Sequence, residues 1–101
     1  MNKIRITVKR MAHYQDLIDQ YENPISDHCP FSVNDSFVLD APIKPAIFCD
    51  SAWETLYPFV KGLFEGEEDY FDGWMKNKKS VLLSCNDGFR PVSFLVEVVE
   101  E

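Results

Sequence analysis

The sequence has none of the motifs that mark the familiar enzyme classes. It contains no G-x-S-x-G nucleophile turn, no G-x-x-x-x-G-K-[ST] phosphate loop and no G-x-G-x-x-G dinucleotide fingerprint. Histidine, the commonest general acid or base, occurs only twice. An enzyme of a common nucleophile or nucleotide-binding class is therefore disfavoured, and whether the protein is an enzyme at all stays open.

Long apolar runs are also missing. No run approaches the roughly 20 apolar residues that a membrane-spanning helix needs. The first ten residues, MNKIRITVKR, mix charged and aliphatic side chains and have no continuous apolar segment of the kind found in signal peptides. We therefore expect a cytoplasmic protein with no membrane partner.

Positive charge is scarce. Ten Lys and Arg stand against 17 Asp and Glu, for a net charge of -7, so nucleic acid should be repelled and is not an expected partner. Four of the cations lie among the first ten residues: Lys3, Arg5, Lys9 and Arg10. On a strand, Lys3, Arg5 and Lys9 would share a face, and a solvated strand face is the favoured interpretation.

What is present is enough apolar material for a folded domain. Hydrophobic residues make up 46% of the chain and aromatic residues 14%, which is too apolar for a disordered chain. A chain of 101 residues predicts a single domain, residues 1–101, with one modest core.

Periodicity predicts the first half of the fold. Residues 3–9 alternate apolar and polar side chains, as a half-buried strand does. Apolar residues at helical spacing between Tyr14 and Tyr21 predict a short amphipathic helix. Residues 22–35 are rich in turn formers and predict a loop, and residues 36–40 predict a short strand.

A second helix should begin near Asp50. Ser51 and Glu54 have the spacing of a capping box, in which each side chain satisfies a free backbone amide of the first turn. Pro58 interrupts the pattern and predicts a kink or a restarted helix. After it come the acidic residues 65–72, expected as an exposed loop, and Trp74, expected to fold back onto the core.

The last two strands form the clearest unit. Residues 81–85 and 92–99 are rich in β-formers, and Asn86, Asp87 and Gly88 between them indicate a hairpin turn. The order is then β-α-β-α-β-β. It predicts an α+β two-layer domain, a mixed four-stranded sheet with two helices on one face. A small, partly closed β-barrel with helices at its mouth is the alternative.

Three cysteines carry most of the chemical interest: Cys29, Cys49 and Cys85. Their odd number argues against a disulfide framework, and no C-x-x-C zinc spacing is present. Each lies at the end of a predicted element. Cys49 comes just before a helix, whose N-terminus favours the thiolate, so it is the candidate catalytic nucleophile. Buried thiols, a shared metal site and a reactive thiol all stay open.

Four residues near the cysteines are secondary candidates. His28 adjoins Cys29 and could add a metal ligand, although adjacent side chains rarely reach one tetrahedral ion. Asp50, Asp87 and Arg90 are candidate ligand-binding residues. Their alternative roles are a helix cap for Asp50, a turn residue for Asp87 and a surface cation for Arg90.

Several short motifs are spaced along the chain: Cys29-Pro30, Phe48-Cys49, Ala52-Trp53 and the segment Cys-x-Asp-Gly-x-Arg-Pro-Val that begins at Cys85. Their spacing resembles that of a family of small, functionally uncharacterised prokaryotic proteins found largely in anaerobes. The resemblance implies that all three cysteines belong to the family signature, and it implies no activity. Two departures stand out, Asn34 in place of an expected glycine and Pro58 within a helix.

The leading hypothesis is a cytoplasmic domain with a metal or small-ligand site where the three cysteines meet. Zn or Fe would be the metal, and Cys29, Cys49 and Cys85 its ligands. One alternative is a non-catalytic homodimeric interaction module with structural cysteines. Another is a thiol redox protein centred on Cys49. The ligand's identity is open in each case.

Overall fold

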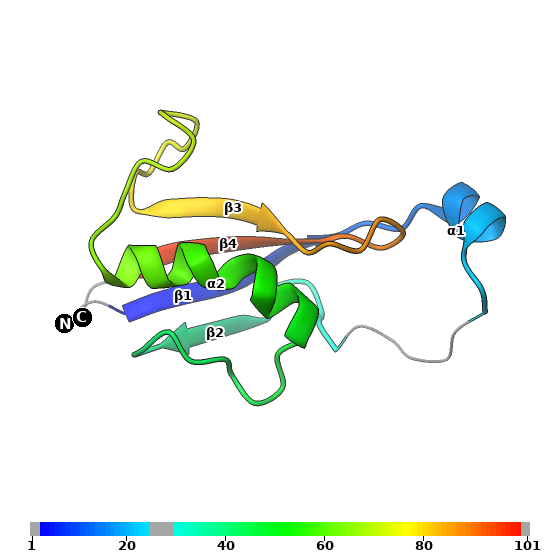
Figure 1. The fold of residues 1–101 in the computed structure, drawn as a ribbon, viewed down its shortest axis with the longest axis horizontal. Helices are drawn as coiled ribbons and strands as arrows, with labels where there is room; N and C mark the ends of the chain where they lie inside the picture. The colour runs from blue at the N-terminus through cyan, green and yellow to red at the C-terminus, as the bar shows by residue number, and fades with distance from the viewer. Residues whose placement is uncertain (1–2, 25–29, 100–101) are drawn as a thin grey trace.

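A computed structural model of the protein describes residues 3–24 and 30–99. Four strands form one sheet in the order β2-β1-β4-β3. Two helices accompany them (Figure 1). The elements are β1 (Lys3–Met11), α1 (Gln15–Tyr21), β2 (Ser36–Leu39), α2 (Asp50–Phe64), β3 (Ser80–Ser84) and β4 (Val92–Val99).

The predicted α+β class and the order of its six elements are confirmed, and the sheet does not close into a barrel. The prediction of a mixed sheet is wrong: all three pairs of neighbouring strands are antiparallel. The physical reason is the length of the connections. Residues 12–35 between β1 and β2 are enough chain for β2 to enter the sheet in either direction, so element order alone does not fix the pairing.

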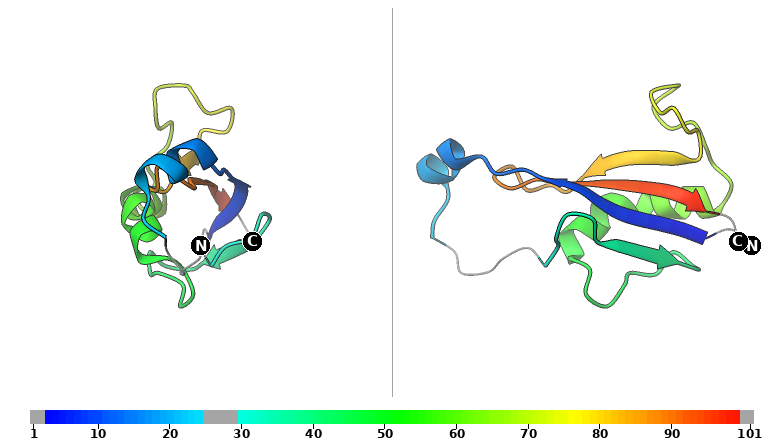
Figure 2. Two further views of the ribbon diagram at one scale, coloured as in Figure 1. Left: turned by 90° about the vertical axis from the view of Figure 1, so that its right-hand side faces the viewer. Right: turned by 180° about the vertical axis from the view of Figure 1, so that it is seen from behind.

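The core lies between one face of the sheet and α2. Alternate residues of the central strands are buried, among them Ile4, Ile6, Phe94 and Val96. Helix α2 places Ala52, Leu56, Val60 and Leu63 against them, at the spacing of one helical face. Viewed from behind, the described elements leave the opposite face of the sheet uncovered (Figure 2).

Helix α1 does not join the helical layer expected on the sheet. It lies beyond the end of the sheet, next to the turn between β3 and β4 (Figures 1 and 2). None of its residues is buried, and Tyr21 is 73% exposed. Its apolar stripe is too short to compete with α2, whose 15 residues cover the core face.

The start of α2 also differs from the expectation. Cys49 is the capping residue, with extended backbone angles, and no side chain caps the helix. Ser51 lies inside the first turn, so no capping box forms. Pro58 lies within one continuous helix, and the helix does not restart there.

Two loop residues, Trp74 and Asn34, also bear on the expected fold. Trp74 is 82% exposed instead of folded onto the core, on a loop of residues 65–79 that projects away from the sheet (Figure 1). Asn34 adopts a φ of 78°, the left-handed turn geometry that asparagine tolerates, at the position where the resemblance implied glycine.

Candidate thiol site

Cys49 and Cys85 lie at the same end of the sheet. Cys49 directly precedes α2, and Cys85 directly follows β3, whose arrowhead points to the end where α2 begins (Figure 1). Both thiols are free, partly exposed and packed against the core. Two of the three predicted cysteines therefore occupy one end of the molecule, while Cys29 and His28 lie outside the described residues.

The first turn of α2 favours the thiolate form of Cys49. The Cys49 Sγ lies 3.3 Å from the Ser51 Oγ. The Ser51 hydroxyl and, after it, the backbone amide of Ala52 donate to the sulfur and lower the Cys49 pKa from its ordinary value. Burial of the thiol and the negative charge of Asp50 oppose this shift without reversing it. A partly exposed cysteine in such a setting is suited to nucleophilic chemistry.

Lys44 contacts the residues on both sides of Cys49. Its Nζ donates to the carbonyl oxygen of Phe48 at 2.9 Å and pairs with the Asp50 carboxylate at 3.0 Å. The ion pair places the positive charge of Lys44 beside the Asp50 carboxylate, whose negative charge raises the Cys49 pKa. Asp50 therefore acts as an ion-pair partner in the first turn of α2. It is not the helix cap considered for it, because Cys49 occupies the capping position and no side chain caps the helix.

Aromatic rings anchor the residue before the thiol. Phe48 is 3% exposed and packs edge-on against Phe31, with centroids 4.8 Å apart. It also lies 5.6 Å from Phe94 of β4 and 5.9 Å from Trp53 of α2. Because Phe48 cannot leave this cluster without opening the core, Cys49 is held at a fixed point of the surface.

Cys85 has a different environment. Its backbone N–H donates to the carbonyl oxygen of Val92 at 3.0 Å, and its sulfur accepts the N–H of Val92 at 3.3 Å. The thiol therefore takes part in closing the hairpin. In the turn after it, Asp87 accepts the N–H groups of Phe89 and Arg90 at 2.8 and 3.1 Å. This is the turn-forming role considered for Asp87.

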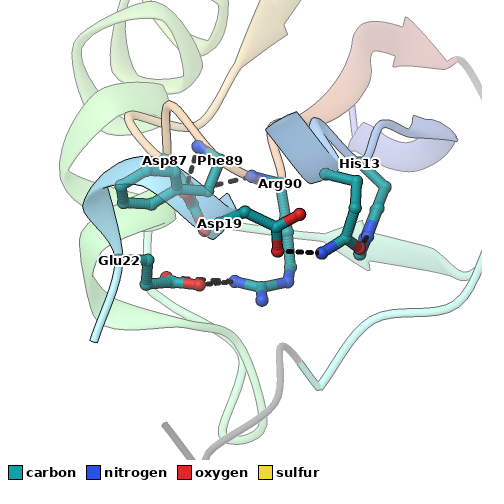
Figure 3. A network of polar contacts seen from close by, with 7 residues as sticks. His13, Asp19, Glu22, Asp87, Phe89 and Arg90 are labelled. Carbon is teal, nitrogen blue, oxygen red and sulfur yellow. Dashed lines mark hydrogen bonds and ion pairs between the residues drawn. The ribbon is translucent and has the colours of Figure 1, made fainter. Parts of the chain in front are cut away.

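Arg90 reaches toward α1 (Figure 3). Its Nη1 lies 2.8 Å from one carboxylate oxygen of Glu22 and 3.1 Å from the other. The N–H of Tyr14 also donates to the carbonyl oxygen of Phe89 at 2.9 Å. Arg90 thus joins the hairpin turn to the C-terminal end of α1, a contact between residues 68 positions apart in sequence.

Metal binding has limited support from these positions. Among residues 3–24 and 30–99, no group of three or more His, Cys, Asp or Glu side chains could hold a metal ion. The predicted three-cysteine site includes Cys29, which lies outside those ranges, so that site stays a prediction.

The residues that sequence reasoning missed are Ser51 and Lys44. The capping-box pattern assigns Ser51 to the backbone, and only the observed helix start shows that its hydroxyl faces the sulfur. A cysteine followed two positions later by serine at a predicted helix start would be a usable signal. Lys44 gives no signal, since its contact depends on the path of the loop before α2.

Comparison with known proteins adds nothing to this picture. No protein-family model, curated protein or solved structure matches the chain significantly. The resemblance drawn from the sequence therefore stays a prediction. Within the described residues, no helix combines the length and apolar character that a membrane span requires.

Proposed function

We propose that the protein acts through Cys49 as a nucleophilic thiol that exchanges with disulfides. The observation that carries the proposal is the first turn of α2, where the Ser51 hydroxyl and a backbone amide favour the thiolate of a partly exposed cysteine. A free thiolate of this kind persists in a reducing compartment, so a cytoplasmic location belongs to the same proposal.

The reaction needs no further cofactor. The Cys49 thiolate attacks one sulfur of a disulfide substrate, a mixed disulfide forms, and the other half of the substrate leaves as a thiolate. A second thiol from the reducing pool of that compartment, attacking the Cys49 sulfur, then releases the first half and restores the Cys49 thiolate. Electrons balance in both steps, because each is an exchange between one thiolate and one disulfide.

The rate of thiol modification as a function of pH tests the proposal. Iodoacetamide should alkylate Cys49 with a midpoint pH below that of the same cysteine in the unfolded chain. Peptide mapping by mass spectrometry assigns each modified thiol, and Cys85→Ser should leave the Cys49 profile unchanged. If Cys49 reacts with a midpoint at or above that of the unfolded chain, the proposal is wrong.

Ser51→Ala is the matched variant. It removes the hydroxyl that is the largest cause of the lowered Cys49 pKa and keeps the helix. The Cys49 midpoint should rise, and exchange with a small aromatic disulfide should slow at neutral pH. Thr55→Ser serves as a control, since Thr55 bonds the Ser51 carbonyl and not the sulfur. An unchanged midpoint in Ser51→Ala would show that the Ser51 hydroxyl is not what lowers the Cys49 pKa.

A second form of the proposal is that the three cysteines are ligands of a soft metal such as Zn or Fe. The shared position of Cys49 and Cys85 at one end of the sheet supports it. Protein purified without oxygen would then contain metal in stoichiometric amount, and chelation would release three reactive thiols. Independent alkylation of metal-free protein at all three cysteines would exclude this version and leave the exchange reaction standing.

An interaction module is the second candidate, and the loop of residues 65–79 supports it. Trp74 is 82% exposed and packs on Phe71 at a centroid distance of 5.6 Å. Exposed aromatic side chains of this size are typical anchors of protein interfaces. If the loop joins two copies of the chain, Trp74→Ser should turn a dimer into a monomer by light scattering. Tyr21→Ser, which also removes an exposed ring, is the control.

A further inference from the structure

A β-bulge in β1 turns two neighbouring cations to the same side of the sheet. Val8 pairs with Phe94 and Arg10 pairs with Ser93, so Lys9 is an extra residue between them. Without the bulge, strict alternation would place Arg10 on the core face with Ile4, Ile6 and Val8. With it, Lys9 and Arg10 both oppose Ser93 on the uncovered face, and Met11 returns to the core side opposite Val92.

The two cations line a hollow on that face. Lys9 and Arg10 form one side of it, Ser93 of β4 the floor, and Leu82 of β3 the far side. The hollow has a volume of about 340 Å³ and opens to solvent. Leu82 is 52% exposed, although its neighbours Val81 and Leu83 are buried on the other face. The site therefore combines two positive charges, one hydroxyl and one apolar wall.

No acidic side chain neutralises these cations in the described part of the chain. Lys9 and Arg10 make no ion pair and no side-chain hydrogen bond there, whereas Arg5 on the same face pairs with Glu97 at 3.2 Å. Glu97 lies four residues from Ser93 along β4, roughly 13 Å at the rise of an extended strand. Two such cations side by side in a protein of net charge -7 repel each other, and an anion would relieve that repulsion.

We propose that this hollow binds a small phosphate monoester that carries an apolar group. The Arg10 guanidinium suits two phosphate oxygens through its planar pair of N–H donors, and Lys9 adds a second charge. The Ser93 hydroxyl can donate to a third oxygen. Leu82 gives the apolar group a surface to cover. A dianionic phosphate fits two cations better than a carboxylate, which carries one charge.

Calorimetric titration at low ionic strength tests the proposal with defined probes. Phenyl phosphate should bind with saturation at one site, more tightly than inorganic phosphate because of the ring on Leu82. Benzoate should bind more weakly than phenyl phosphate. Added salt should weaken the binding, as it does for exposed charges. Tighter binding of benzoate, or no saturable binding of phenyl phosphate, overturns the proposal.

Variants locate the site. Arg10→Gln should weaken phenyl phosphate about tenfold, the loss expected for one charge-assisted interaction. Lys61→Gln removes the same charge from the exposed face of α2, on the other side of the sheet, and should leave affinity unchanged. Equal weakening in both variants would mean general charge attraction and would overturn the assignment.

Deletion of Lys9 is the second variant. It restores regular alternation, with Val8 and Met11 facing the core and Arg10 facing outward, so the strand should stay paired and the protein folded. The hollow then loses one cation and the bulge that shapes it. A deletion variant with wild-type thermal unfolding and greatly weakened phenyl phosphate binding supports the site. Unchanged binding in that folded variant overturns it.

Discussion

At the scale of single residues, the protonation of Cys49 and of Tyr70 is controlled by contacts with residues two or three positions away, in the first turn of α2 and in the loop after it. Ser51 lies two positions from Cys49 and determines how easily the thiol loses its proton. At the other end of α2, Glu67 lies three positions from Tyr70 and accepts the phenol hydrogen bond at 2.9 Å. The two contacts have opposite effects, because the first favours the ionised form and the second the neutral form.

Tyr70 should titrate abnormally late. Burial, followed by the hydrogen bond to Glu67, raises its pKa from 10.0 to about 12. The neutral phenol is the favoured form in the fold, so this contact contributes stability below pH 10 and loses it as pH rises toward 12. Glu67→Gln should lower the Tyr70 pKa yet leave it above 10, since burial is the largest cause. Ultraviolet difference titration against Tyr70→Phe measures it, and an unchanged Tyr70 pKa in Glu67→Gln would contradict the contact.

At the scale of elements, Pro58 is the residue of α2 whose replacement should stabilise the fold. Proline removes the hydrogen bond to the Glu54 carbonyl and strains the preceding turn. It lies on the exposed side of a helix that nevertheless runs unbroken from Asp50 to Phe64. Pro58→Ala should raise the free energy of unfolding by roughly 1–3 kcal/mol, measured by urea denaturation.

A different outcome for Pro58→Ala would have a structural meaning. Pro58 shares a shallow surface hollow with Trp53, Glu54 and Tyr57. If the variant is less stable than the parent, the proline ring packs against these side chains. The stability from that packing then exceeds the cost of the hydrogen bond that proline removes from the helix. Tyr57→Ala in both backgrounds would then reveal the coupling as a departure from additivity.

The elements also show which features the sequence could predict. Strands with strict alternation, such as residues 3–9, and the hairpin at Asn86 to Gly88 are confirmed, because their pattern depends on local burial alone. The predicted position of α1 is wrong, since a stripe of four apolar residues does not say which surface they will meet. The same limit applies to Ser51, whose partner depends on where the helix begins. Alternation correctly assigns Lys9 to a solvated face. It would place Arg10 on the core face, because a period of two does not reveal the bulge that turns Arg10 outward.

At the scale of the whole molecule, the candidate chemistry is divided between two faces. The thiols lie on the helix side at one end of the sheet, and the hollow of Lys9 and Arg10 lies on the uncovered side. The sheet between them contributes buried residues to the core from β1, β3 and β4. Each site can therefore be altered without disturbing the other, and Cys49→Ser should leave phenyl phosphate binding, measured by calorimetry, unchanged.

The position of α1 outside the core predicts that it opens independently of the rest. It buries no residue, and the described contacts that hold it are the Arg90–Glu22 ion pair and backbone hydrogen bonds such as the one from Tyr14 to Phe89. Glu22→Gln weakens the ion pair, in which Glu22 is only 13% exposed. Hydrogen exchange of the Ile18 amide should speed up roughly fivefold, the change expected when the free energy of opening α1 falls by about 1 kcal/mol.

The core should not respond to that change, because amide exchange in β1 and β4 requires opening of the sheet and not of α1. Asp16→Asn is the control, since it removes the same charge from the same helix without touching Arg90. Faster exchange at Ile18 in Glu22→Gln alone would show that the ion pair holds α1 against the hairpin. Equal acceleration in β4 would mean that α1 unfolds together with the sheet, and the independence argued from its lack of buried residues would be wrong.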